Sequence, residues 1–427
     1  MYIHVVQAGQ SLWGISQLYG LTYQSVIAAN LLSSTNIVPG QSLVIPIPTR
    51  AYVVLPGDTL GTIAKRYRVS VQQLLAWNPQ VQGTTVNAGQ ILSLPTVQRP
   101  NKVALGFLEL VQAQTDAANV YANAPYYTYL APFGFGMTTT GAIVGTQDAA
   151  ALAALVNTQA LPAATFSNWV DNQFSPGAVH VLLSSTSTRQ QYVAEVLRIV
   201  QAKGYKAVVI DFESIHPEDR DTFVEFLSEL KTPMQPLGIP LIVCVMPITG
   251  RLPYEGVTIR AYDYAGIARH SDYVMLMSYN WSWPGGPPGP VSSLPLVEDN
   301  IRYALARMSS KKVLLGLVRY GYDWTLPYQP GEATSTLAID AVVDLAMQSQ
   351  IPIQFDPQSF TPSFRYWDRQ GVEHVVWFED ARSLQMKLQL VQKYRLAGVA
   401  AWELHEGFPQ FNQLLTDNFQ IEQFPKG

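Results

Sequence analysis

Apolar runs alternate with helical patterns along the chain from residue 101 onward, and this alternation constrains the fold more than any other feature. Runs that are apolar nearly throughout, such as residues 273–277, are typical of parallel strands buried on both faces. Eight runs can be counted: Val103–Leu110, Tyr126–Phe133, Pro162–Trp169, Ala207–Glu213, Pro240–Pro247, Tyr273–Asn280, Lys312–Tyr320 and Gly398–Leu404. Eight strand–helix units in about 330 residues predict an α/β fold, a (β/α)8 TIM barrel.

The spacing between the seventh and eighth runs is too long for one helix. We therefore expect an insertion between these strands, roughly from Thr325 to Trp377. Within it the pattern predicts a helix over Thr336–Gln348 and a hairpin that turns at residues 368–371, Asp-Arg-Gln-Gly.

The first 97 residues contain an internal repeat. His4–Leu12 aligns with Tyr52–Leu60 at an offset of 48 residues, and Val38–Leu43 aligns with Asn87–Leu92 after one extra residue. Each copy indicates a short strand, a glycine turn, two helices and a closing strand, which is a small βααβ module. In the second copy either Asp58 or Thr59 could cap the first helix. We expect modules at 1–48 and 50–97, followed by a barrel domain at 99–427.

Composition excludes several classes of function. A formal net charge of −4 gives no basic footprint for nucleic acid. Cys244 is the single cysteine, so an intrachain disulfide and a cysteine-based zinc site are excluded, and no cofactor or metal is expected. The first residues do not resemble a signal peptide, and no apolar run is long enough to span a membrane. We expect a monomer.

The chemistry of a (β/α)8 barrel lies where its strands end. Asp211 and Glu213 close the fourth run two residues apart, so they share a face with Cα atoms about 6–7 Å apart. Neighbouring buried carboxylates couple their titration, and one can hold the proton that a general acid needs. From spacing alone, a salt-bridged pair at the barrel rim remains an alternative.

Aromatic and polar residues gather at the other strand ends. Aromatic faces stack on the apolar faces of sugar rings, although each of these side chains could equally belong to the core. The candidate substrate-binding residues are Phe133, Trp169, Met246, Asn280, Trp281, Tyr322, Asp323, Trp324 and Trp402, and Tyr279 lies beside them.

The two repeats resemble the LysM module, which recognises N-acetylglucosamine polymers in peptidoglycan and chitin. The resemblance implies glycan binding near the glycine turns, at Gly9, Gln10 and Ser11 in the first copy and at Gly57, Asp58 and Thr59 in the second. Inert spacers are the alternative.

The barrel resembles glycoside hydrolase family 18, whose fourth strand carries the pattern D-x-x-D-x-D-x-E. The last two members of that pattern fall on Asp211 and Glu213, while the earlier aspartates fall on Lys206 and Val209. The family's M-x-Y-D resembles residues 277–280, Met-Ser-Tyr-Asn, and its eighth-strand tryptophan resembles Trp402. Asn280 cannot ionise, so the resemblance gives it a hydrogen-bonding role only.

Residues 319–328 and 376–383 resemble the LysM-bearing spore-germination branch of that family, N-acetylglucosaminidases that digest cortex peptidoglycan. The resemblance implies a spore-associated enzyme with Glu213 as general acid, Asp211 and Tyr279 around the substrate acetamido group, and Trp402 beneath that sugar. Two alternatives remain open: a chitinase or chitooligosaccharide hydrolase, and a non-catalytic glycan-binding spore-coat protein on the same barrel.

Overall fold

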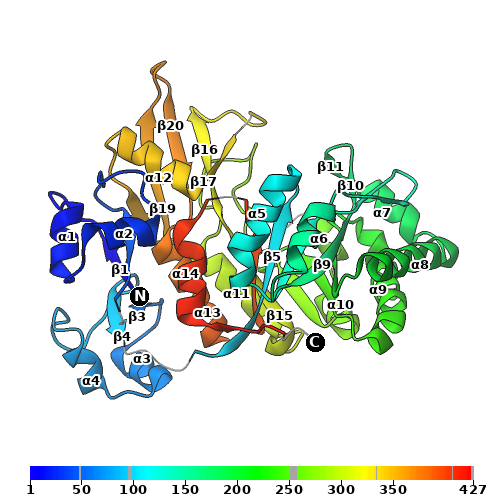
Figure 1. Cartoon of the computed structure of the whole chain (residues 1–427), viewed down its shortest axis with the longest axis horizontal. Helices are drawn as coiled ribbons and strands as arrows, with labels where there is room; N and C mark the ends of the chain where they lie inside the picture. The colour runs from blue at the N-terminus through cyan, green and yellow to red at the C-terminus, as the bar shows by residue number, and fades with distance from the viewer. Residues whose placement is uncertain (48–49, 95–98, 251–256, 333, 406, 425–427) are drawn as a thin grey trace.

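The computed structural model describes residues 1–47, 50–94, 99–250, 257–332, 334–405 and 407–424. Figure 1 shows two small modules beside a large barrel, with an inserted sheet above the modules. No helix in the described part of the chain is both long and apolar enough to cross a bilayer.

The barrel is a closed ring of eight parallel strands. Neighbours in the ring are hydrogen-bonded, and pairing of the last strand with the first closes it. The strands are β5 (Asn101–Glu109), β6 (Tyr129–Phe133), β9 (Leu161–Ser167), β12 (Ala207–Asp211), β13 (Leu241–Val245), β14 (Tyr273–Leu276), β15 (Val313–Val318) and β21 (Gly398–Trp402). Each falls within or overlaps one of the eight apolar runs, so the predicted (β/α)8 barrel is confirmed.

Several ladders end earlier than the apolar runs do. β12 stops at Asp211 and β14 at Leu276, so Glu213 and Tyr279 lie beyond the ladders, on the loops at the barrel mouth. Short strands outside the ring include β1 (Tyr2–Val5), β7 (Gly136–Met137), β8 (Ile143–Val144), β10 (Trp169–Val170), β11 (Gln173–Phe174) and β22 (Gln420–Ile421).

Helices cover the outside of the ring because their apolar faces pack on the strands. They are α5 (Ala113–Asn123), α6 (Ala149–Leu155), α7 (Pro176–Leu183), α8 (Thr186–Lys203), α9 (Arg220–Met234), α10 (Tyr264–His270), α11 (Leu294–Leu305), α13 (Ala381–Lys393) and α14 (Pro409–Asn418). Helix α8 shows why such a helix starts and stops: Ser185 accepts from the Thr188 N–H at its start, and Gly204 ends it with φ +75°.

The insertion is an antiparallel sheet with one helix. Its strands are β16 (Tyr320–Leu326), β17 (Ser335–Ala338), β18 (Gln354–Asp356), β19 (Thr361–Trp367) and β20 (Glu373–Trp377), and its helix is α12 (Ile339–Gln348). The hairpin at 368–371 is confirmed, since β19 and β20 pair across it. The predicted helix over Thr336–Gln348 was wrong in its first turn. Residues 336–338 are extended because they pair with β16, and that tertiary pairing overrides the local helical pattern.

Each repeat folds as the expected βααβ module. The first contains β1, α1 (Leu12–Leu18), α2 (Tyr23–Asn30) and β2 (Ser42–Ile45). The second contains β3 (Arg50–Val53), α3 (Leu60–Tyr67), α4 (Val71–Ala76) and β4 (Ile91–Leu94). Of the two possible caps of the second copy, Thr59 caps α3 in a capping box with Thr62. The module boundaries predicted at 48 and 97 lie outside the described residues.

The modules pack directly on helices α13 and α14, which lie beside them in Figure 1. Every residue of α13 from Ala381 to Val391 is buried, because the barrel covers one side of this helix and the modules cover the other. The contact includes hydrogen bonds from Arg382 Nη2 to the Gly40 carbonyl (2.8 Å) and from Gln413 Nε2 to the Ala29 carbonyl (2.7 Å). The modules are thus part of the outer layer of the barrel.

Candidate active site

Two adjoining cavities lie at the carboxyl ends of the barrel strands. The smaller, of about 160 Å³, is lined by Asp211, Glu213, Cys244, Tyr279 and neighbouring apolar side chains. The larger, of about 1130 Å³, lies over the ends of β5, β6 and β9. Phe174 and Trp402 line both cavities. A small pocket that holds two carboxyl groups therefore adjoins a larger cleft.

The carboxyl pair comes from the end of β12, as the strand spacing predicts. Asp211 is buried, and its Oδ1 atom has no hydrogen-bond partner among the residues that the structure describes. Burial raises the pKa of Asp211 to about 6. Burial, and next the charge of Asp211, raise the pKa of Glu213 well above its ordinary value. The two side chains share one pocket, so one carboxyl group can stay protonated near neutral pH while the other ionises.

The carboxyl pair is not salt-bridged within the described part of the chain. Neither Asp211 nor Glu213 forms an ion pair with a described lysine, arginine or histidine. The Cys244 thiol hydrogen-bonds Asp211, and both carboxyl groups line the pocket, where they can interact with a ligand.

Two protonated groups border the pair. Burial raises the pKa of the Cys244 thiol well above its ordinary value, and so do the charges of Asp211 and Glu213. Burial, and next the neighbouring Cys244, Asp211 and Glu213, raise the pKa of the Tyr279 phenol well above its ordinary value. Both groups therefore keep their protons at neutral pH. Tyr279 can donate a hydrogen bond to a substrate oxygen in the pocket.

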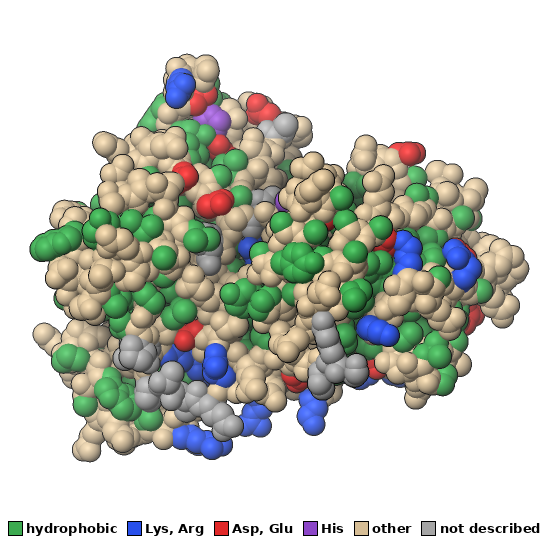
Figure 2. Space-filling model, viewed as in Figure 1, with side chains coloured by type: hydrophobic (Ala, Val, Ile, Leu, Met, Phe, Trp, Pro, Cys, Tyr) green, Lys and Arg blue, Asp and Glu red, His purple; other side chains and the backbone are tan. Residues whose placement is uncertain are grey.

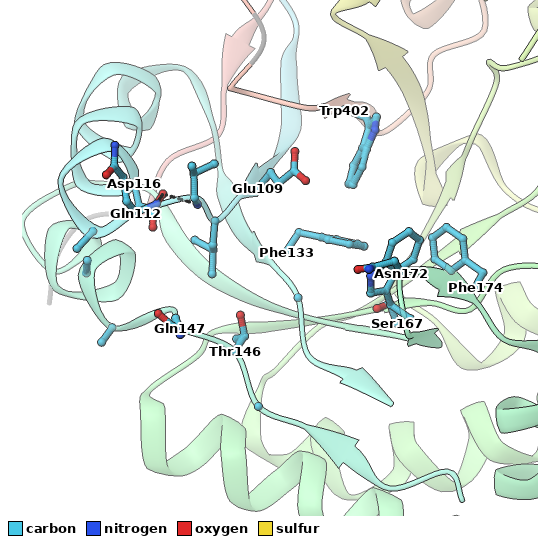
Figure 3. Close-up of a pocket in the computed structure, with 18 residues that line it drawn as sticks. Glu109, Gln112, Asp116, Phe133, Thr146, Gln147, Ser167, Asn172, Phe174 and Trp402 are labelled. Atoms are coloured by element: carbon cyan, nitrogen blue, oxygen red, sulfur yellow. Dashed lines mark hydrogen bonds between the residues drawn. The ribbon is translucent and has the colours of Figure 1, made fainter. Parts of the chain in front are cut away.

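Trp402 stands between the small pocket and the cleft. Its ring meets Phe107 and Phe133 edge-on, with centroid distances of 5.5 and 5.0 Å. Figure 3 shows Trp402 and Phe133 projecting into the same space, with the Glu109 carboxylate directed toward it. Trp169 lines the cleft farther out and is 39% exposed. These aromatic faces suit the binding of successive sugar rings.

Asn280 is held in a fixed orientation at the rim of the small pocket. Its Oδ1 atom accepts from Tyr320 Oη at 2.8 Å and from Tyr322 Oη at 2.9 Å, and the residue has φ +59°, which asparagine tolerates. No described residue accepts from its amide nitrogen, so this nitrogen can donate to a ligand. Tyr322 therefore acts on the pocket through Asn280.

Five of the predicted substrate-binding residues line neither cavity, Tyr322 and the four described next. Trp324 is buried, and its Nε1 donates to the Gly286 carbonyl at 3.0 Å, so its indole packs the insertion against a loop. Asp323 accepts from Tyr366 and lies 3.0 Å from His374 within the inserted sheet. Met246 and Trp281 pack against the core. Alternate residues of β16 face opposite sides of the inserted sheet, and the sequence of residues 320–324 does not show which side faces the substrate.

The side chains predicted to bind glycan in the modules make local hydrogen bonds. Ser11 and Thr59 cap helices, and Gln10 Oε1 accepts from the Gln7 N–H at 2.8 Å. Asp58 accepts from the Leu55 N–H at 3.0 Å and pairs with Arg66 at 2.9 Å. Gly9 and Gly57 adopt φ +79° and +80° in the turns. Glycan binding at these six positions remains a prediction.

The sequence reasoning missed Phe174, Glu109 and Asn168. Phe174 reaches both cavities from the β10–β11 hairpin, which is two residues per strand and has no detectable periodicity. Glu109 ends β5 and lines the cleft. Asn168 follows β9 and is fully buried, and its side chain bonds to the Glu213 backbone. A polar residue near the end of an apolar run was the available signal for Glu109 and Asn168.

Comparison with known proteins identifies the family. The sequence profile described as glycosyl hydrolases family 18 matches residues 142–407, and the LysM domain profile matches residues 4–46 and 52–95. The chain belongs to glycosyl hydrolases family 18. It is a glycoside hydrolase with two LysM domains, and both sequence resemblances are confirmed.

Relatives match this family 18 enzyme along its whole length. The provisionally named sporulation-specific glycosylase YdhD of Bacillus subtilis (strain 168) is 36% identical, with coverage of 99% of this chain and 100% of that protein. The cortical fragment-lytic enzyme of Bacillus cereus is 30% identical, with 98% of each chain covered. The crystal structure of the Bacillus cereus spore cortex-lytic enzyme SleL superimposes with a TM-score of 0.88 at 30% identity, covering 99% of this chain and 98% of that one.

Proposed function

We propose that this family 18 enzyme hydrolyses N-acetylglucosaminyl linkages in peptidoglycan, with fragments of spore cortex as its substrate. One observation carries the proposal. A buried carboxyl pair shares a pocket with Trp402, and this pocket adjoins a larger cleft, in a chain similar over its length to a cortical fragment-lytic enzyme. The LysM domains would hold the glycan.

The first step we propose is protonation and internal attack. Protonated Glu213 gives its proton to the glycosidic oxygen, and the bond from that oxygen to the anomeric carbon breaks. The oxygen of the substrate's own 2-acetamido group forms the new bond to the anomeric carbon, giving an oxazolinium ion. Asp211 accepts from the acetamido N–H, and its partnerless Oδ1 supports this role. Tyr279 donates to the acetamido oxygen.

The second step returns the enzyme to its starting state. The Glu213 carboxylate takes a proton from water, which attacks the anomeric carbon and breaks its bond to the acetamido oxygen. Two inversions give net retention of configuration. The raised pKa of Glu213 supports the exchange of acid and base roles, since the group must be protonated in the first step and ionised in the second.

The electrostatics of the cleft fit a substrate that is recognised through its neutral N-acetylglucosamine units. The two ionisable side chains that line the larger cavity, Glu109 and Asp116, are both acidic. The face in Figure 2 shows lysine and arginine in separate groups, at the lower edge, on the right-hand side and at the top, and no continuous basic surface. Amide and hydroxyl groups of N-acetylglucosamine need hydrogen-bonding partners rather than cations.

A digest of two substrates tests the proposal. Purified cortex fragments and chitooligosaccharides are each treated with the enzyme, and the products are identified by mass spectrometry. New reducing-end N-acetylglucosamine from cortex, with slower cleavage of chitooligosaccharides, is the expected result. Cleavage of chitooligosaccharides alone would replace the proposal with a chitinase, and binding without cleavage of either substrate would indicate a non-catalytic glycan-binding protein.

A further inference from the structure

Asn168 connects three parts of the active site through one buried side chain. The residue is 0% exposed and directly follows β9. Its Oδ1 accepts from the Glu213 N–H at 2.8 Å, and its Nδ2 donates to the Glu213 carbonyl at 2.8 Å. The same Nδ2 lies 3.1 Å from the Ser175 carbonyl, and the Asn168 carbonyl accepts from the Ser175 N–H at 2.9 Å.

Glu213 needs such support because the sheet no longer holds it. The ladder between β12 and β9 ends where Asp211 pairs with Ser167, two residues before Glu213. The next residue, Ser214, has φ +57°, so the chain turns away immediately after Glu213. In the described part of the chain, Asn168 supplies both hydrogen bonds to the Glu213 backbone. Its carboxamide thus takes the place of the next rung of the ladder.

The bonds to Ser175 extend this support to the substrate cleft. Ser175 follows the β10–β11 hairpin, in which Trp169 pairs with Phe174 at a ring-centroid distance of 4.9 Å. Trp169 lines the cleft, and Phe174 lines both the cleft and the small pocket. One side chain therefore fixes the backbone of the carboxyl group relative to an aromatic wall that faces the sugars.

We propose that Asn168 is a positioning residue for the general acid, which it holds in register with the aromatic hairpin of the cleft. The inference rests on the proposed function, since it takes Glu213 as the acid. A buried side-chain amide is stable when its polar atoms are hydrogen-bonded, as those of Asn168 are. A misplaced general acid lowers kcat because the proton donor is out of position, while substrate binding is little affected.

The test uses the leaving group to separate positioning from folding. A sugar hydroxyl leaves only with a proton from the acid, whereas 4-nitrophenolate leaves without one. The full-length Asn168→Ala enzyme is assayed on an N-acetylglucosamine oligosaccharide and on its 4-nitrophenyl glycoside. We expect kcat to fall about 100-fold on the oligosaccharide and less than about tenfold on the nitrophenyl glycoside, with KM little changed.

Two control variants define the outcomes. Asn123→Ala removes another buried asparagine, which donates to the Asn119 carbonyl and accepts from Asn412, far from the carboxyl pair. It should leave kcat on both substrates within about twofold of wild type. Glu213→Gln tests the acid itself: if this variant keeps wild-type activity on the oligosaccharide, the proposed function fails and not merely the role of Asn168.

The inference is overturned if Glu213→Gln is inactive on the oligosaccharide while Asn168→Ala loses equal activity on both substrates, or none. If Asn168→Ala does not fold, Asn168→Asp decides by the same comparison. This variant keeps the size and the acceptor oxygen but lacks the nitrogen that donates to Glu213 and Ser175. Equal losses on the two substrates in a folded Asn168→Asp enzyme would likewise overturn the inference.

Discussion

Gly40 and Gly89 offer a matched test of whether the LysM modules are fixed to the barrel. The two glycines occupy the same position in the two repeats, with φ +82° and +85°, and each N–H donates at 2.8 Å, to Val6 and Val54 respectively. They differ in what surrounds them. A Cβ atom at Gly89 would meet nothing within 4 Å, whereas one at Gly40 would collide with the backbone carbonyl of Ile353 on the barrel side of the interface.

The two alanine variants should therefore differ in stability. Both pay about 1–2 kcal/mol for an L-residue in the left-handed region. Gly40→Ala must also push its module off the barrel, which breaks the 2.9 Å bond from the Ile353 N–H to Pro39 and the 2.8 Å bond from Arg382. These bonds contribute about 0.5–1.5 and 1.5–3 kcal/mol. We expect losses of about 1–2 kcal/mol for Gly89→Ala and about 3–6 kcal/mol for Gly40→Ala.

Urea unfolding of the full-length variants, followed by tryptophan fluorescence and far-ultraviolet circular dichroism, measures both losses. A shared loss of about 1–2 kcal/mol would refute the reasoning, because it would mean that the first module leaves the barrel at no cost.

Two further predictions concern the site. Asp211→Asn should lower kcat by orders of magnitude and at the same time stabilise the fold. The pKa of Asp211 rises from 3.8 to about 6 on folding. Ionisation of Asp211 therefore destabilises the folded wild type by up to about 3 kcal/mol at pH 7. The stability gain of Asp211→Asn should disappear as the pH falls below about 4, because Asp211 is then protonated in both the folded and the unfolded state. Melting temperatures of the two proteins between pH 4 and 7 measure this gain. A wild type that is more stable than the variant at pH 7 would contradict the prediction. Trp324→Phe should lower the free energy of unfolding by about 1–3 kcal/mol, because the Gly286 carbonyl loses its partner, and should leave KM unchanged. Trp402→Ala should instead raise KM about tenfold. Denaturation and steady-state kinetics distinguish the two effects, and a raised KM in Trp324→Phe would show that Trp324 contributes to sugar binding.

The barrel and the modules could be predicted from the sequence because both follow from periodicity. Eight apolar runs define eight buried strands, and a repeat at a fixed offset defines two copies of one module. Asp211 and Glu213 were accessible for the same reason, since two residues on one strand share a face. The first turn of the predicted helix at Thr336 was wrong because pairing with a distant strand decided it.

Site residues were harder to predict where their position depends on a loop or on which face of a strand carries them. Trp402 ends barrel strand β21 and stands at the pocket, whereas Trp324 comes after β15 and packs the insertion, since β16 leaves the barrel for a second sheet. Phe174 enters from a short hairpin without a sequence pattern. The packing of the modules on α13 could not be predicted from the sequence either. It buries Gln385, Lys387 and Gln389 of that helix, and buried polar side chains need hydrogen-bond partners.

The central claim is that Glu213 supplies the proton for glycosidic cleavage. The direct measurement is turnover of N-acetylglucosamine oligosaccharides by Glu213→Gln, alongside binding of the same variant to insoluble peptidoglycan. The amide keeps the shape of the side chain but has no proton to transfer, so turnover should fall below about 1% of wild type, in line with the loss of general acid catalysis, while binding is unchanged. Turnover near the wild-type rate in a variant that binds normally would contradict the account.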